Sequence, residues 1–424
     1  MTTPSLAADS RPILPGSTLG VMGGGQLGAM FAAAAKRMGY RVEAISDVAD
    51  CPCARHCDRV HVVGYDDLEK LAAIAGSLDV VTFEFENIPV SAARAMQAAV
   101  PVRPAPEVLH TTQDRAREKA FLVAHGFPCA PHRLIRSREE LAAAVKALGM
   151  PCVLKTAAFG YDGKGQRKIT TTAEIDAAWD RLGPQECVLE GWIDFECEIS
   201  VVAARSLDGE TAVFEPSRNA HANHILDVAS APAGLPDGVR SVACDMASLV
   251  LEKLGMVGVA CIEFFVTRTG DILVNEIAPR PHNSGHLTIN ACATSQFEQQ
   301  VRAVCGLPLG ETRQSAPAAM ANLLGDCWAG GEPDWAAALA VPGVSLHLYG
   351  KSDPRPGRKM GHLTAVADSV EEAERWYQRA IDLGSPRGAY GMGIVRERFG
   401  DLAGAREWYV RGEQMETEIG RAHV

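Results

Sequence analysis

The chain has 424 residues and a formal net charge of −11, so it is long enough for about three domains with cores of their own. The acidic balance and the lack of any basic block exclude an extended nucleic-acid surface. No apolar run is long enough to cross a bilayer, and no signal peptide precedes the twelve scattered cysteines. These features predict a reduced, soluble, cytoplasmic protein without a membrane partner.

The first part of the chain alternates strand-like and helical patterns. Residues 1–15 are rich in Pro, Ser and Ala and predict a disordered leader, and residues 16–112 predict the first domain. Its expected strands are 17–22, 40–46, 59–63 and 80–85, and its expected helices are an Ala-rich one closed by Gly39 and one at 68–75. Strands that alternate with helices predict a doubly wound parallel sheet, and therefore an α/β fold.

The rest of the chain mixes short strands and helices before it becomes wholly helical. Residues 113–305 predict a second domain, with a subdomain at about 127–195. Its expected elements are helices at 113–125, 138–148 and 238–254 and strands at 152–157, 166–171 and 187–193. A smaller β-rich domain is expected at 306–369, with turns at Pro342-Gly343 and Pro356-Gly357, and a helical tail at 370–424.

The first glycine-rich loop, Gly23–Gly28, follows a strand, precedes a helix and fits G-x-G-x-x-G. Asp47 lies about 20 residues further on, as in dinucleotide-binding folds. Backbone amides at a helix N-terminus bind phosphate, so the loop predicts an anion site. The motif is short and occurs in unrelated proteins, so a nicotinamide dinucleotide site and plain packing of helix on strand remain alternatives.

A second glycine-rich loop, residues 159–166, follows the strand that carries Lys155. Its glycines let the backbone close over phosphates, and Lys155 and Lys164 supply positive charge. The loop lacks the spacing and the Gly-Lys-Ser/Thr ending of a P-loop. A plain hairpin turn is the alternative, although a hairpin does not need flanking lysines. The strand at 187–193 could meet an adenine through backbone hydrogen bonds.

Residues 262–290 carry the densest polar chemistry of the chain. Two strand-like runs joined by an Arg-Thr-Gly-Asp turn bring together Glu263 and Glu276, with Asn275 beside them. These hard oxygens suit Mg²⁺, which prefers carboxylates plus nucleotide phosphates. A solvated strand face is the alternative, but the apolar neighbours place the acids beside a core, where carboxylates need partners. A Pro-punctuated polar loop follows, with Arg280, His282, Asn283, Ser284 and His286.

Together these residues resemble the ATP-grasp superfamily, and six blocks are similar to one family within it. The blocks are GGGQLGAM, TFEFENIP (82–89), QDRAREK (113–119), GYDGKGQ (160–166), NEIAPRPHNSGH (275–286) and RPGRKMGH (355–362). In this order they resemble the N5-carboxyaminoimidazole ribonucleotide synthases of purine biosynthesis. The resemblance implies an ATP-grasp fold with an N-terminal doubly wound parallel sheet, central α+β ATP-grasp domains, a small β-rich C-terminal domain and a helical tail.

The resemblance implies a nucleotide site with ATP and Mg²⁺ as cofactors. Arg115 and Lys155 are expected at the phosphates, and Glu198 at the ribose hydroxyls. The expected metal ligands are Glu263 and Glu276, with Asn275 beside them. The loop expected to close over the phosphates is Gly160, Tyr161, Asp162, Gly163, Lys164, Gly165 and Gln166. The other nucleotide contacts that it implies are His221 and, along the adenine, Glu190, Gly191, Trp192 and Ile193.

The resemblance also implies a reaction, the ATP-driven carboxylation of 5-aminoimidazole ribonucleotide by bicarbonate through carboxyphosphate, in a homodimeric ligase. The expected ribonucleotide contacts are Gly25, Gln26, Leu27, Glu84, Tyr161, Arg280, Asn283, Ser284, Lys351 and Arg358. The expected catalytic residues are Asp162, Arg280 and Lys351. Asp162 is the candidate for positioning or deprotonating the amine, and a loop carboxylate without such a role is the alternative.

Several features depart from the family pattern. Ala29 and Lys164 stand where relatives often carry Arg. Residues 373–384 and 405–412 repeat at a 32-residue interval and look similar to a Sel1-type or tetratricopeptide unit. So few repeats favour a helical cap on the catalytic body over a partner surface. A compact group of possible metal ligands is too compressed for a typical zinc site, namely Cys51, Cys53, His56 and Cys57.

Two other functions remain open. An ATP-grasp enzyme with a different acceptor, such as a formyltransferase or a biotin carboxylase, would keep the same nucleotide site. The Asn-Ser-Gly-His loop and the Arg-Pro-Gly-Arg-Lys segment favour the carboxylation of aminoimidazole ribonucleotide instead. A catalytically reduced interaction protein would use the helical tail as its surface. The presence of the acids, the amide and the lysine argues against it, namely Glu263, Glu276, Asn275 and Lys155.

Overall fold

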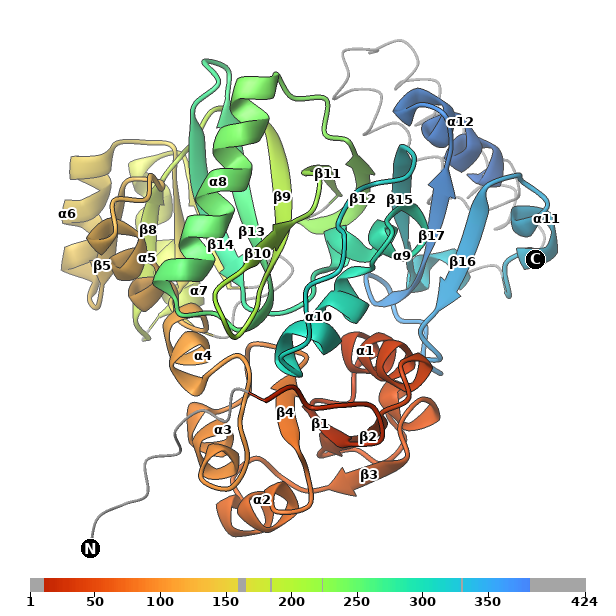
Figure 1. Cartoon of the computed structure of the whole chain (residues 1–424). Helices are drawn as coiled ribbons and strands as arrows, with labels where there is room; N and C mark the ends of the chain where they lie inside the picture. Colours follow the sequence, from red (N-terminus) through yellow and green to blue (C-terminus); the bar gives the residue numbers. More distant parts are fainter. Residues whose placement is uncertain (1–10, 159–164, 184, 223, 329–330, 382–424) are drawn as a thin grey trace, which may run out of the picture.

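The computed structural model describes residues 11–158, 165–183, 185–222, 224–328 and 331–381. These residues form three sheets with helices around them (Figure 1). The chain runs from an N-terminal unit through a small antiparallel sheet into one large sheet. This arrangement confirms the predicted α/β fold. Most of the second glycine loop and the tail beyond residue 381 lie outside the described ranges.

The N-terminal unit is a four-stranded parallel sheet in the order β3-β2-β1-β4. Helix α1 covers one face through Phe31 and Ala35, and helices α2 and α3 cover the other through Leu71 and Met96. Helices on both faces confirm the doubly wound sheet. The elements are β1 (Thr18–Met22), α1 (Gln26–Arg37), β2 (Arg41–Ser46), η1 (Pro52–Arg55), β3 (Arg59–Val62), α2 (Leu68–Ala75), β4 (Val80–Phe83), α3 (Val90–Gln97) and α4 (Pro106–Thr112).

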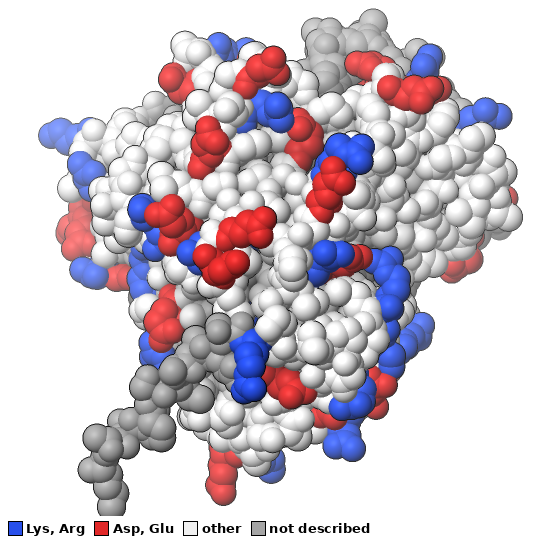
Figure 2. Space-filling model, viewed as in Figure 1, with Lys and Arg blue, Asp and Glu red and all other residues white. Residues whose placement is uncertain are grey.

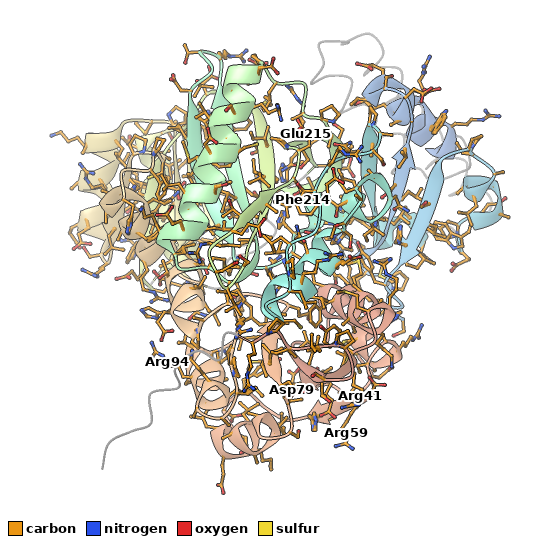
Figure 3. All side chains as sticks on the ribbon, viewed as in Figure 1. Arg41, Arg59, Asp79, Arg94, Phe214 and Glu215 are labelled. Carbon is orange, nitrogen blue, oxygen red and sulfur yellow. The ribbon has the colours of Figure 1, made fainter. Side chains whose placement is uncertain are left out.

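The two ends of this sheet differ in their chemistry. At the amino end of β1, the N–H of Thr18 donates to the Asp79 carboxylate at 2.7 Å, and Arg41 Nε donates to Thr18 Oγ1 at 3.0 Å (Figure 3). At the opposite end, β1 leads into the first glycine loop. Because β1 and β4 run parallel, β4 ends beside that loop, and Glu84 lies at the same edge.

The second unit is a small antiparallel sheet in the order β5-β8-β6-β7. Helices α6 and α7 pack against it through Leu141 and Ala178. Strands β6 and β7 flank the second glycine loop in the sequence. With the helix α5 that precedes them, the elements are α5 (Arg115–Ala124), β5 (His132–Ile135), α6 (Arg138–Leu148), β6 (Cys152–Thr156), β7 (Gln166–Ile169), η2 (Thr172–Glu174), α7 (Ile175–Leu182) and β8 (Cys187–Gly191).

The large sheet has nine strands, eight of them in the order β14-β13-β9-β11-β12-β15-β17-β16, while β10 pairs with β9. Helix α8 packs on it through Ala247 and Leu251, against Ile262 and Phe264. The elements are β9 (Phe195–Arg205), β10 (Thr211–Val213), β11 (Ser217–Ala222), β12 (Ile225–Ala231), α8 (Asp237–Lys253), β13 (Gly258–Thr267), β14 (Ile272–Ala278), η3 (Asn283–Leu287), α9 (Thr288–Ala291), α10 (Gln296–Val304), β15 (Ala318–Leu324), η4 (Gly325–Trp328), α11 (Trp335–Leu339), β16 (Val344–Leu348), β17 (Lys359–Val366) and α12 (Val370–Ile381).

The strands of the predicted β-rich region continue the large sheet instead of forming one of their own. Strand β12 pairs antiparallel with β15, in a register that runs from Val228 opposite Ala321 to Ala231 opposite Ala318. The predicted turns occur before β16 and β17, and Gly343 and Gly357 take positive φ angles of 72° and 74° there. The local pattern therefore predicted the β-rich character and the turns of this region, but not the sheet that its strands join.

Helix α12 packs on this C-terminal extension of the sheet. Ala373 is fully buried in a cluster with Ala319, Ala365 and Ala367. Trp376 lies so close to Gly343 that a Cβ there would collide with the indole ring. The helix therefore covers a face of small residues that permits a close approach. The predicted repeat begins within α12, and its second copy lies outside the described residues.

The outer surface mixes both signs of charge. On the face shown in Figure 2, acidic and basic side chains are scattered among broad uncharged areas. All twelve cysteines lie within the described ranges, and each is a free thiol. In the described part of the chain, no helix is both long and apolar enough to span a membrane.

We expect α12 to stabilise the C-terminal part of the large sheet. A chain that ends at Asp368 lacks this helix, whereas a chain that ends at Ile381 keeps it. Because the loss of a packed Trp costs about 3–5 kcal/mol, the shorter chain should unfold about 4–6 °C below the longer one in calorimetry. Equal midpoints for the two truncated chains would contradict a stabilising role for α12.

Candidate functional site

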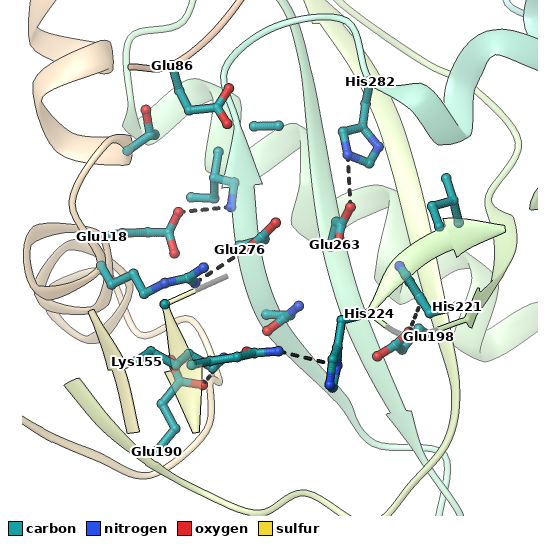
Figure 4. A pocket seen from close by; sticks show the side chains of 18 of the residues that line it. Glu86, Glu118, Lys155, Glu190, Glu198, His221, His224, Glu263, Glu276 and His282 are labelled. Carbon is teal, nitrogen blue, oxygen red and sulfur yellow. Dashed lines mark hydrogen bonds and ion pairs between the residues drawn. The ribbon is translucent and has the colours of Figure 1, made fainter. Parts of the chain in front are cut away.

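A cleft of about 1080 Å³ lies where the three sheets meet, and it collects most of the predicted site residues. One wall comes from the first glycine loop and the end of β4. A second comes from β6, β7 and β8 of the small sheet, and a third from β9, β13 and β14 of the large sheet (Figure 4). A cleft of this size can enclose two small substrates at once.

The predicted metal ligands face each other across two paired strands. Glu263 on β13 lies opposite Glu276 on β14, and the register then shifts so that Phe264 lies opposite Val274. The shift makes Asn275 the extra residue of a β-bulge. Neighbouring residues of a strand normally point to opposite faces, but a bulge re-aims side chains, and Asn275 and Glu276 both line the cleft.

These three residues fit Mg²⁺. Asn275 Oδ1 is buried and has no hydrogen-bond partner among the described residues, although a buried amide oxygen normally has one. No cluster of three His, Cys, Asp or Glu in the described part of the chain has the spacing of a metal site. Mg²⁺ commonly takes one or two carboxylates and completes its shell with phosphate oxygens and water. Glu263, Glu276 and the free oxygen of Asn275 match that ligand set.

His282 contacts the Glu263 carboxylate and lies above it in the view of Figure 4. Its Nε2 lies 3.1 Å from Glu263 Oε1, and its Nδ1 accepts the N–H of Ser284 at 3.4 Å. Nδ1 is therefore the acceptor, and Nε2 carries the proton that is donated to Glu263. Burial lowers the pKa of His282 well below its usual value, so the imidazole is neutral. Burial also raises the pKa of Glu263, and the charge of Glu276 raises it further.

A group of cations lies on the side of the small sheet. Lys155 Nζ on β6 lies 2.8 Å from Glu190 Oε2 on β8, and the fully buried Lys119 lies 3.7 Å from Glu190 Oε1. Burial opposes ionisation of Glu190, but the charges of Lys155 and Lys119 lower its pKa to about 2. Arg115 Nη1 lies 3.2 Å from Glu276 Oε2. Internal acids thus hold the basic side chains in place at the cleft.

The first glycine loop binds an anion from within the chain. The Glu84 carboxylate accepts the N–H of Gly25 and, at 2.7 Å, the N–H of Gly28. A Cβ on Gly25 would collide with that carboxylate. Burial raises the pKa of Glu84, whereas the two amides lower it. Because Glu84 already accepts these two loop amides, they do not point at an open phosphate site, and Asp47 does not line the cleft; both observations disfavour the nicotinamide alternative.

The polar loop after β14 connects the N-terminal unit to the large sheet. Arg280 forms an ion pair with Glu86. Burial alone would raise the pKa of Glu86, but the charge and hydrogen bond of Arg280, a backbone hydrogen bond and the charge of Lys359 together lower it. Asn283 exchanges two hydrogen bonds with Asn322 on β15, at 3.0 and 2.7 Å. The loop is therefore anchored at both ends while Arg280 and Asn283 line the cleft.

The far end of the cleft carries the predicted adenine and ribose contacts. Glu198 on β9 pairs with His221 on β11, where the strand pairing has another bulge (Figure 4). Trp192 is 44% exposed, and Lys168 Nζ lies 3.4 Å from the centre of its indole. A cation over an indole is an attractive arrangement, so Lys168 fixes the ring at the rim of the cleft.

Comparison with known proteins identifies the family. Three family models match in order: the ribonucleotide synthetase preATP-grasp domain at residues 17–113, the ATP-grasp domain at 120–297 and the phosphoribosylaminoimidazole carboxylase C-terminal domain at 318–375. N5-carboxyaminoimidazole ribonucleotide synthase from Bacillus subtilis is 41% identical over 366 residues, which are 86% of this chain and 95% of that protein. The chain belongs to the N5-carboxyaminoimidazole ribonucleotide synthase family.

Solved structures of this family have the same fold. An ADP complex of an N5-carboxyaminoimidazole ribonucleotide synthetase is similar with a TM-score of 0.84 and 41% identity, over 88% of this chain and 98% of that one. The Aspergillus clavatus enzyme in complex with ADP and 5-aminoimidazole ribonucleotide is similar with a TM-score of 0.79 and 30% identity, over 87% and 98% of the two chains. The ATP-grasp fold predicted from the sequence is confirmed.

The cleft of this family member brings together most of the predicted residues. Ser284 is fully buried behind the wall, Lys351 Nζ donates to the carbonyl of Lys359 at 2.6 Å, and Arg358 Nη1 donates to the carbonyl of Asp353 at 2.8 Å. None of these three lines the cleft, although Lys351 is near enough to lower the pKa of Glu84. Residues 160–164, including Tyr161 and Asp162, lie outside the described ranges. The predicted residues that line it are Gly25, Gln26, Leu27, Glu84, Arg115, Lys155, Gly165, Gln166, Glu190, Gly191, Trp192, Ile193, Glu198, His221, Glu263, Asn275, Glu276, Arg280 and Asn283.

Several residues of the site were not assigned from the sequence. Lys119 lies one turn after Arg115 on the same helix face, and this spacing was a signal that could have found it. His282 stands in the predicted polar loop, but the sequence alone assigns it no role. Three further wall residues stand within the blocks shared with the family but were assigned no role there, namely Glu86, Glu118 and Lys359. Nothing local marks two others, Lys168 and His224.

The cysteine group next to the first glycine loop serves packing. Cys51 and Cys53 are buried, and a Cβ on Gly24 would lie 2.6 Å from Cys51 Sγ. The N–H of Cys53 donates to the carbonyl of Gly24 at 3.0 Å. Burial raises the pKa of Cys53 and of Cys57, which disfavours the thiolates that zinc needs. The described residues therefore do not support the zinc alternative.

Glu118 on α5 is a buried acid in the cleft wall. Its Oε2 accepts the N–H of Ile277 at 2.9 Å, and its Oε1 is buried without a hydrogen-bond partner among the described residues. Burial raises the pKa of Glu118 from 4.5 to about 7. The carboxyl therefore changes its charge near neutral pH, directly behind the strand that carries Glu276.

We predict that Glu118 makes the free protein less stable as the pH rises. A raised pKa favours folding fully below about 4.5, and this contribution is lost as the pH rises through about 7. The free energy of unfolding should therefore fall by about 3 kcal/mol more in the wild type than in Glu118→Gln between pH 4.5 and 8, as measured by urea denaturation. Parallel pH profiles for the two proteins would show that Glu118 titrates normally.

Proposed function

We propose that the chain carboxylates 5-aminoimidazole ribonucleotide to N5-carboxyaminoimidazole ribonucleotide with ATP and bicarbonate, and releases ADP and phosphate, in purine biosynthesis. The observation that carries this proposal is the shared cleft. One part of the cleft carries the cations and carboxylates that suit Mg²⁺-ATP, and another part carries the Arg280–Asn283 loop. The paired residues Glu263 and Glu276 line the same cleft. The relatives that share the fold and the sequence are named for this reaction.

The nucleotide half of the site would bind the phosphates through charge. Lys155 and Arg115 already face the cleft, and each is held by an acid that fixes its position. Mg²⁺ bound by Glu263, Glu276 and Asn275 would neutralise charge on the phosphate oxygens during transfer. Preorganised charges of this kind act on phosphoryl transfer without a covalent enzyme intermediate. The family complexes with ADP or ATP support a nucleotide at this place.

The proposed reaction has three steps. A bicarbonate oxygen attacks the γ-phosphorus, the bond to the β-phosphate oxygen breaks, and ADP leaves. The resulting carboxyphosphate breaks its C–O bond to give CO₂ and phosphate. The exocyclic amine of the ribonucleotide forms the new N–C bond and loses a proton. The enclosed cleft would keep CO₂ near the amine, which is a proximity effect.

The ribonucleotide half would use the first glycine loop and the polar loop. Gln26 and Glu84 lie on one side of it, and Arg280 and Asn283 lie on the other. Glu84 accepts the amides of the loop, so these amides are not available to a phosphate of the substrate. The loop would instead present the Glu84 carboxylate to hydroxyl groups of the ribonucleotide. The Aspergillus clavatus complex with 5-aminoimidazole ribonucleotide supports this acceptor over other ATP-grasp acceptors. Asp162 remains our candidate for positioning the amine.

Three further features belong to the proposal. Mg²⁺ as the working metal is supported by the oxygen donors at Glu263, Glu276 and Asn275. A cytoplasmic homodimer is what the family resemblance implies. The Sel1-like or tetratricopeptide-like interpretation of residues 370–424 is supported by the sequence repeat, and α12 packs as the proposed cap requires.

The decisive test is whether phosphate release depends on the acceptor. Purified protein with Mg²⁺-ATP and bicarbonate should release phosphate at least about tenfold faster when 5-aminoimidazole ribonucleotide is added, because productive turnover needs both halves of the cleft. Omission of Mg²⁺ or of bicarbonate should abolish the increase. Equal release without the ribonucleotide, or none with it, would refute the proposed function.

A further inference from the structure

Gln296, the first residue of α10, lies behind the polar loop and is fully buried. Its Oε1 accepts the N–H of His282 at 2.9 Å, and its Nε2 donates to the carbonyl of the same residue at 2.7 Å. Nε2 also lies 3.0 Å from Nδ1 of His286. The amide of one side chain therefore clamps both backbone groups of His282 and reaches a second residue of the loop.

The clamped residue is the one that joins the two halves of the cleft. His282 donates from Nε2 to Glu263 and lies between Arg280 and Asn283 in the sequence (Figure 4). Gly285 lets the clamp come close, since a Cβ there would lie 2.6 Å from Gln296 Oε1. A shift of the His282 backbone would move its imidazole relative to Glu263 and would move its neighbours with it.

The same helix offers a matched comparison. Gln299 is also fully buried and clamps both backbone groups of one residue, with Nε2 donating to the Gly310 carbonyl at 2.8 Å and Oε1 accepting the Gly310 N–H at 2.7 Å. Gly310 does not line the cleft. Gln296 and Gln299 thus form the same pair of side-chain-to-backbone hydrogen bonds, but only Gln296 forms them with a residue of the cleft wall, His282.

We propose that Gln296 is a positioning residue for the carboxylation, and that it sets the distance between the ribonucleotide loop and the metal carboxylates by clamping His282. This inference rests on the proposed function. Gln296 itself touches neither substrate half of the cleft, so it acts through His282. Because a misplacement of about 1 Å can cost about 100-fold in rate, a loosened clamp should slow turnover while the nucleotide lysines stay in place.

The test compares Gln296→Met with Gln299→Met in the full-length chain. Each variant loses a buried amide clamp, so both should lower the thermal midpoint, and Gln296→Met should lower it more because it also loses the contact with His286. Only Gln296→Met should lower kcat for ribonucleotide-dependent phosphate release, by about 10- to 100-fold. Its KM for ATP should stay within about twofold of the wild type, because Lys155 and Arg115 are held by other residues.

Gln296→Asn is the milder variant, and it decides the matter if Gln296→Met does not fold. It keeps the amide but is one methylene too short to reach both backbone groups, so its kcat should fall about tenfold. Equal losses of kcat in the Gln296 and Gln299 variants, or wild-type kcat in a folded Gln296 variant, would overturn the proposal. A wild-type enzyme without ribonucleotide-dependent release would instead refute the proposed function.

Discussion

The site depends on two carboxylates that face each other across a pair of buried strands. Glu263 and Glu276 lie in register on β13 and β14, and the bulge beside them turns Asn275 into the same cleft. Like charges on directly paired positions repel in a partly buried cleft, and cations or hydrogen-bond donors help them to stay ionised. Arg115 meets Glu276, and the neutral His282 meets Glu263. A divalent cation would complete the neutralisation. The pairing of Glu263 with Glu276, which costs stability through repulsion, is therefore also what would create the metal site.

The other charges of the cleft are arranged around this pair. Glu190 holds Lys155 and Lys119 on the side of the small sheet, and Glu86 holds Arg280 on the side of the N-terminal unit. Each basic side chain is therefore in position before a substrate arrives. Fixed charges of this kind need little reorganisation during phosphoryl transfer, which is where electrostatic catalysis gains most. One cation group belongs to the side of the small sheet and the other to the polar loop beside the N-terminal unit, and Arg115, Lys155 and Arg280 line the same cleft as the acids.

Local patterns predicted much of the fold and the site. Helices α2 and α6 begin and end at the predicted residues, because the spacing of their apolar residues and their capping residues are local features of the sequence. The acids of β13 and β14 were predicted to meet because a short turn between two strands fixes their pairing. The blocks shared with the family gave the ATP-grasp fold, which the comparisons confirm.

What the sequence did not predict depends on contacts between distant segments. Glu84, which follows β4, accepts the amides of the first glycine loop, and the motif alone could not show that these amides are occupied. The join between β12 and β15 and the clamp of Gln296 on His282 depend on tertiary packing, which has no periodic signal. Lys351 and Arg358 were assigned by resemblance, but their side chains donate to the carbonyls of Lys359 and Asp353, and neither of the two lines the cleft.

In the proposed reaction, bicarbonate attacks ATP in this cleft, and the carboxyphosphate then breaks down beside the ribonucleotide. Isotope transfer tests it most directly. Bicarbonate labelled with ¹⁸O should be supplied with Mg²⁺-ATP and 5-aminoimidazole ribonucleotide, and the released phosphate analysed by mass spectrometry or ³¹P NMR. The account predicts one ¹⁸O atom in each phosphate, because the attacking bicarbonate oxygen stays on phosphorus when the C–O bond breaks. Phosphate without label would contradict it.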